Sequence, residues 1–94
     1  MAPQALYFLN HPFMLEQSRL AAQRLVSTQS SDEALVRQAY REILARSPGP
    51  RELRLALDFV TVSASEQDAE ARRLDNWSLL IQTLFASVDF RYLN

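Results

Sequence analysis

Residues 30–53, SSDEALVRQAYREILARSPGPREL, decide how this chain folds. Their first part predicts a helix over 31–46, because apolar residues recur every three or four positions on one half of the helical wheel: Leu35, Val36, Ala39, Tyr40, Ile43 and Leu44. Ser30 is the expected N-cap, and Glu33 stands three residues later, as in a capping box. The run Ser47-Pro48-Gly49-Pro50 ends this helix, and Pro50 suits the first turn of the next one.

Two spacings of four residues, Glu33–Arg37 and Glu42–Arg46, add favourable ion pairs along the same helix. Outside this helix, apolar residues that recur about every 3.6 positions predict three further main helices, over residues 12–26, 50–62 and 76–87, and a short N-terminal helix over residues 3–9. Residues 63–75 are polar and lack an apolar stripe, so they are predicted to be a linker. The fold class is all-α, a small bundle of four main short helices plus a short N-terminal helix, in one domain over residues 1–94.

In the helix expected at 12–26, the predicted buried residues are Met14, Leu15, Ala21, Ala22, Leu25 and Val26. Phe13 and Leu20 form a second stripe, which predicts burial on two sides. In the helix at 76–87, a single apolar face is predicted, made by Trp77, Leu80, Ile81, Leu84, Phe85 and Val88.

Composition excludes several classes of function. The 94 residues carry ten basic and eleven acidic side chains, a net charge of −1, so no cationic surplus favours nucleic acid. No apolar run approaches the roughly 20 residues of a membrane span, so membrane insertion is not expected. The absence of cysteine excludes disulfides and covalent c-type haem attachment, and a single glycine leaves no phosphate-binding loop.

No residue pattern predicts a catalytic, cofactor-binding or metal-binding site. His11 is the sole histidine and is interpreted as the residue that starts the helix at Pro12. Asp32 and Glu33 lie in a helical first turn, where carboxylates favour the helix dipole. The acids of the polar stretch lack the spacing and the glycine of a calcium loop: Glu66, Asp68, Glu70 and Asp75.

An interaction surface is the most informative candidate site. The helix at 50–62 has one apolar face toward the core and a second stripe that includes Leu55 and Phe59. Such a helix is either sandwiched in the core or half exposed as a docking surface. Large apolar residues also gather near both ends of the chain, where a partner or the bundle itself would cover them: Tyr7, Phe8, Phe90 and Tyr92.

Several segments together resemble the planctomycete domain of unknown function 1553 (DUF1553), at its C-terminal end: PQAL, LNHPF, ILARSPGPREL and WSLLIQTLFASVDFRYL, at residues 3–6, 9–13, 43–53 and 77–93. The chain departs from that pattern at helix ends. Ala45 stands where the family has a capping glycine, and Gly49 stands where it has a threonine N-cap, which removes one capping hydrogen bond. Ala86 and Val88 replace two asparagines of the closing motif.

The resemblance implies a C-terminal part of a large exported protein, periplasmic or on the cell surface, with a cytochrome c-like domain upstream. It supplies no catalytic residues. The leading hypothesis is a non-catalytic helical module that docks on upstream domains or on a second copy of itself. One alternative is an accessory part of a haem-linked or polysaccharide-related enzyme that shapes a pocket, through Arg46, Arg51 or Asp89. Another is a carbohydrate or cell-surface binding module.

Overall fold

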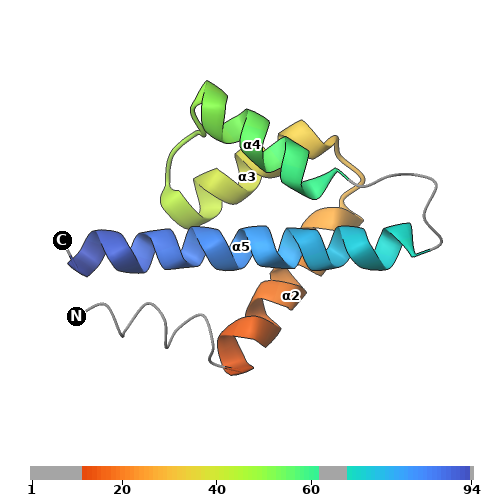
Figure 1. The fold of residues 1–94 in the computed structure, drawn as a ribbon, viewed down its shortest axis with the longest axis horizontal. Coiled ribbons are helices and arrows are strands. Elements are labelled where there is room, and N and C mark those ends of the chain that lie inside the picture. The colour runs from red at the N-terminus through yellow and green to blue at the C-terminus, as the bar shows by residue number, and fades with distance from the viewer. Residues whose placement is uncertain (1–11, 62–67, 94) are drawn as a thin grey trace.

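The computed structural model describes residues 12–61 and 68–93, with the side chains of the second range up to Val88. These residues form four helices and no strand (Figure 1): α2 (Pro12–Ser27), α3 (Asp32–Leu44), α4 (Pro50–Val60) and α5 (Ala69–Leu93). The predicted fold class, a small all-α bundle, is confirmed. The short helix expected at 3–9 and the residue His11 lie outside the described residues.

Helix α5 is the central helix of the bundle. Its 25 residues correspond to a length of about 37 Å, and it contacts each of the other three helices. Helices α3 and α4 form a hairpin that lies along one side of α5, while α2 crosses α5 steeply (Figure 1). Every layer of the core therefore includes side chains from α5.

The core is made by the apolar faces of α3, α4 and α5, together with Ala22 and Leu25 of α2. Its largest fully buried side chains are Trp77, Leu35, Ile81, Val36 and Val60. The Nε1–H of Trp77 has no hydrogen-bond partner among the described residues, although the whole side chain is removed from solvent. Packing rather than polar pairing therefore holds this indole in place.

Helix α2 buries a narrower face than the sequence predicts. Ala22 and Leu25 are buried as expected, but Leu15 is 40% exposed, and the second stripe of Phe13 and Leu20 faces outward. The side of α2 that carries Phe13 and Leu20 is turned away from α3, α4 and α5. The fully buried Ser18, which was not expected in the core, lies on the covered side.

Helix α3 begins one residue later than predicted, because Ser31 and not Ser30 is the N-cap. The extended backbone of Ser31 lets its Oγ accept a hydrogen bond from the Ala34 amide at 3.2 Å. Asp32 and Glu33 then occupy the first turn, where their charges favour the helix dipole. Glu33 also pairs with Arg37 at 3.1 Å, as predicted.

Helix α3 also ends earlier than predicted, at Leu44. Ala45 adopts a left-handed conformation with φ 58° and ψ 32°, and its amide donates to the Arg41 carbonyl at 3.1 Å. This is the αL cap that usually requires glycine, because a Cβ is strained at positive φ. The predicted Glu42–Arg46 pair is therefore wrong: the chain leaves the helical path before Arg46.

Ala45→Gly is expected to raise the free energy of unfolding by about 1 kcal/mol, because glycine adopts the left-handed conformation without a Cβ penalty. Urea unfolding followed by circular dichroism measures the change. The matched control is Ala34→Gly in the right-handed part of α3, where the same substitution is expected to lower stability by up to about 1 kcal/mol. Equal effects of the two substitutions would contradict the strained cap.

Helix α4 ends at Val60, two residues before the predicted end. Thr61 is the C-cap with extended backbone, and its Oγ1 donates to the Leu57 carbonyl at 2.6 Å. At the other end Gly49 is the N-cap and offers no side-chain acceptor, as the departure from the family pattern predicts. The Glu52 carboxylate still accepts a hydrogen bond from the Gly49 amide at 2.8 Å.

Helix α5 begins at Ala69, so the linker predicted over 63–75 is wrong for its second half. Residues 69–74 are good helix formers despite their lack of an apolar stripe, and long-range contacts hold this first part in place. Arg73 pairs with Asp32 of α3 at 2.6 Å, and Asp75 pairs with Arg19 of α2 at 3.1 Å. Tertiary ion pairs thus help to stabilise a helical segment that apolar periodicity in the sequence does not reveal.

Candidate functional site

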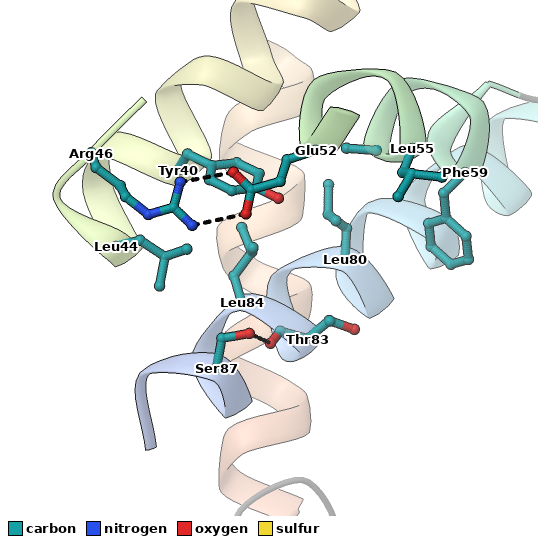
Figure 2. Close-up of a pocket in the computed structure, with 11 residues that line it drawn as sticks. Tyr40, Leu44, Arg46, Glu52, Leu55, Phe59, Leu80, Thr83, Leu84 and Ser87 are labelled. Carbon is teal, nitrogen blue, oxygen red and sulfur yellow. Dashed lines mark hydrogen bonds and ion pairs between the residues drawn. The ribbon is translucent and has the colours of Figure 1, made fainter. Parts of the chain in front are cut away.

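A groove runs between the C-terminal end of α3, the helix α4 and the second half of α5 (Figure 2). Its cavity volume is ≈ 370 Å³. It is mostly apolar, with one charged end, and is lined by Tyr40, Leu44, Arg46, Glu52, Leu55, Ala56, Phe59, Leu80, Thr83, Leu84 and Ser87. Its residues come from the α3–α4 hairpin and from α5, so the groove exists only in the assembled bundle.

The outer wall of the groove is formed by two large apolar side chains of α4. Leu55 is 58% exposed and Phe59 is 46% exposed, whereas Ala56 between them is buried. Leu80 and Leu84 of α5 form the floor and are almost fully buried (Figure 2). The groove therefore presents an accessible apolar wall beside an apolar floor.

One end of the groove carries a two-pronged ion pair. Arg46 donates from both terminal nitrogens to the two carboxylate oxygens of Glu52, each at 2.8 Å (Figure 2). The guanidinium also lies over the Tyr40 ring, 5.5 Å from its centroid, a distance at which a cation and an aromatic face attract each other. The left-handed turn at Ala45 is what brings Arg46 to this position.

The ion pair shifts the titration of the groups at this end. The hydrogen bonds from Arg46, followed by the one from the Gly49 amide, lower the pKa of Glu52 from 4.5 to about 2. The hydrogen bond with Glu52 raises the pKa of Arg46. Burial, and then the charge of Glu52, raise the pKa of the Tyr40 hydroxyl, while the charge of Arg46 opposes the change.

The hydroxyl groups that α5 contributes to the groove are already engaged with their own helix. Thr83 Oγ1 donates to the Leu79 carbonyl at 2.9 Å, and Ser87 Oγ donates to the Thr83 carbonyl at 3.1 Å. Because these protons are committed and the Arg46–Glu52 charges satisfy each other, the rim offers few directional groups to a small polar ligand.

Two of the six predicted interface residues, Leu55 and Phe59, lie on this groove. Tyr7 and Phe8 lie outside the described residues. Phe90 and Tyr92 lie in helix α5, but their side chains are outside the part of the chain that the structure describes. The docking role of all six stays a prediction.

Sequence reasoning missed the charged end of the groove. The sequence predicted an ion pair between Arg46 and Glu42. In the structure Glu42 instead contacts Arg24 at 3.3 Å and Gln38 at 2.8 Å. One signal was present: Glu52 stands three residues after the N-cap Gly49, the position from which a glutamate side chain folds back over the helix start. The partner that reaches Glu52 there could be found only from the turn at Ala45.

Acid is expected to destabilise the fold through Glu52. Its folded pKa of about 2 lies below 4.5, so the stabilisation is complete above pH 4.5 and is lost as the pH falls toward 2. Because both side chains are about 40% exposed, solvent screening limits the contribution to about 1 kcal/mol. Urea unfolding should show Glu52→Gln less stable by that amount at neutral pH, with the difference shrinking as the pH falls through 2.

The matched control for this titration is Glu70→Gln, since the Glu70 carboxylate is exposed and has no ion pair among the described residues. Its effect on stability is expected to stay within about 0.5 kcal/mol at every pH. A difference between Glu52→Gln and the unsubstituted chain that did not shrink in acid would refute the role of the carboxylate charge.

The described ranges, 12–61 and 68–93, contain neither a metal-binding cluster nor a membrane-spanning helix. No three histidine or acidic side chains lie close enough there to hold a metal ion together. None of the helices in these ranges combines the length and the apolar character that crossing a bilayer requires.

The comparison with known families supports the resemblance noted in the sequence. Residues 1–60 match the family model described as PSD1, protein of unknown function (DUF1553). The match covers α2, α3 and α4, including Leu55 and Phe59, and ends before α5. Neither a curated protein nor a solved structure matches the chain. Since the match spans more than half of the 94 residues, the chain belongs to the DUF1553 family of proteins of unknown function.

Proposed function

We propose that this chain is a non-catalytic docking module whose α4–α5 groove receives an apolar helical segment of protein. The observation that carries the proposal is the exposure of Leu55 and Phe59 beside the buried leucines of α5. Exposed apolar residues grouped at a groove are typical of a surface that another protein covers. The occupant belongs either to the same polypeptide or to a second chain.

The chemistry of the groove favours a protein segment over a small metabolite. Its charged groups, Arg46 and Glu52, neutralise each other at one end, where the Tyr40 ring also lies, and the hydroxyl groups of Thr83 and Ser87 bond to the backbone of α5. What remains along the groove is apolar. An amphipathic helix fits such a surface because its apolar residues recur at i, i+3, i+4 and i+7 along one face.

A synthetic amphipathic helix with leucines at that spacing is a suitable probe. We expect amide NMR shifts to concentrate in residues 52–59 and 80–87 during its titration. Leu55→Asp and Phe59→Asp should each weaken binding by about 30-fold, the cost of losing one buried apolar side chain and desolvating a carboxylate. Fluorescence anisotropy of the labelled peptide measures the affinity.

The matched control is Leu79→Asp. Leu79 is 48% exposed, close to the value for Phe59, but lies on α5 outside the groove. It should leave the affinity unchanged. Equal weakening by Leu79→Asp, or shifts spread over the outer face of α2, would overturn the assignment of the groove as the docking surface.

A further inference from the structure

We infer that a second copy of this chain covers the α4 wall of the groove, with the two α4 helices antiparallel about a two-fold axis. The inference rests on the proposed docking function and names its partner. It is carried by the arrangement of charges along α4, which is complementary to itself only in the antiparallel orientation.

The first observation is a pair of opposite charges on one flank of the exposed stripe. Arg51 and Asp58 are seven residues apart, two helical turns, so they lie on the same line along the helix, about 10 Å from each other. Both are exposed, and neither has an ion pair among the described residues. Their midpoint along the helix lies beside Leu55, the most exposed apolar residue of α4.

The second step is geometric. The two-fold axis lies in the interface and runs perpendicular to both α4 helices. Rotation about it makes the two helices antiparallel and places each flank of α4 against the same flank in the other copy. With the axis beside Leu55, Arg51 of each copy faces Asp58 of the other, and the two leucines meet at the centre. A parallel pair has its two-fold axis along the helices and brings each flank against the opposite flank of the copy, so Arg51 and Asp58 would not face each other.

The same rotation places Phe59 where the groove can receive it. Phe59 lies on the groove side of Leu55, so in the second copy it faces the first turn of α4, where Arg46 and Glu52 close the groove (Figure 2). An aromatic ring fits this end, because the guanidinium of Arg46 already lies over one ring, that of Tyr40. The apolar wall of each copy thus covers the groove of the other.

Contact through one short helix and a groove falls at the small end of specific interfaces, so the dimer is expected to be weak and to depend on concentration. Sedimentation equilibrium of the full chain should show a monomer at low micromolar concentration and a dimer at high micromolar concentration. Leu55→Asp should keep the chain monomeric throughout, whereas Leu79→Asp should not change the equilibrium.

Charge exchange tests the orientation. Arg51→Asp alone places two acids opposite each other, and Asp58→Arg alone places two bases opposite each other, so each variant should be monomeric. An equimolar mixture of the two variants restores both attractive pairs and should dimerise, with the affinity recovered to within a few-fold. Arg41→Asp, on the exposed side of α3, makes the same charge change away from the interface and should have no effect.

The outcomes separate this inference from the proposed function. A monomer at every concentration, with the synthetic helix still bound in the groove, would overturn the second copy and keep the docking function. A monomer that binds no helix would overturn both. A dimer whose affinity is unchanged by Arg51→Asp and by Asp58→Arg would overturn the antiparallel arrangement.

Discussion

Replacing Trp77 with alanine is expected to lower the free energy of unfolding by about 4 kcal/mol, the largest loss from any single side chain in the bundle. Trp77 is the largest fully buried side chain and belongs to the core shared by all four helices. Its removal leaves a cavity that the surrounding helices cannot close, because each is fixed by contacts with α5.

A domain of this size has a total stability of about 5–14 kcal/mol, so the alanine variant should lose between a third and most of it. Thermal and urea unfolding followed by circular dichroism measure the loss. The control is Trp77→Phe, which keeps much of the volume and removes the unpaired Nε1–H donor, whose burial is itself unfavourable. We expect it to cost no more than about 2 kcal/mol, and equal losses from both variants would contradict packing as the role of the indole.

The second large effect is expected at Ile81, where substitution by alanine should cost about 3 kcal/mol. Ile81 is fully buried on α5, while Leu79, two residues earlier on the same helix, is 48% exposed. Leu79→Ala should therefore change stability by no more than about 0.5 kcal/mol. The pair measures which face of α5 points into the core.

Urea unfolding of the two variants provides the comparison, with the unsubstituted chain as reference. If Leu79→Ala were as damaging as Ile81→Ala, α5 would be rotated about its axis relative to the orientation that buries Ile81 and exposes Leu79. That result would also displace Leu80 and Leu84 from the floor of the groove.

The sequence predicted the faces of the helices better than their ends. Leu35, Val36 and Ala39 were placed in the core correctly, because a strong 3.6-residue period depends only on local geometry. Helix ends depend on single capping interactions. Apolar periodicity is too coarse to distinguish Ser30 from Ser31 as the N-cap or to predict the left-handed conformation of Ala45.

The start of α5 could not be predicted for a different reason. The ion pairs of Arg73 and Asp75 join residues 41 and 56 positions apart, and no local pattern reports such contacts. The outer half of the groove was predictable, since Leu55 and Phe59 form a second apolar stripe on a helix whose other face is buried. The charged end was not, since Arg46 reaches Glu52 only after the turn at Ala45.

The place of α5 after α3 and α4 in the chain has a consequence for how the protein emerges from a ribosome. Residues 32–60 can form the α3–α4 hairpin as soon as they leave the exit tunnel, but the helix that covers the hairpin is synthesised after it. Until then Leu44, Ala56 and Val60 have no neighbour from α5 and stay open to water or to a chaperone. The groove is completed only when α5 has been translated, so a chain stopped before residue 80 would carry its outer wall without its floor.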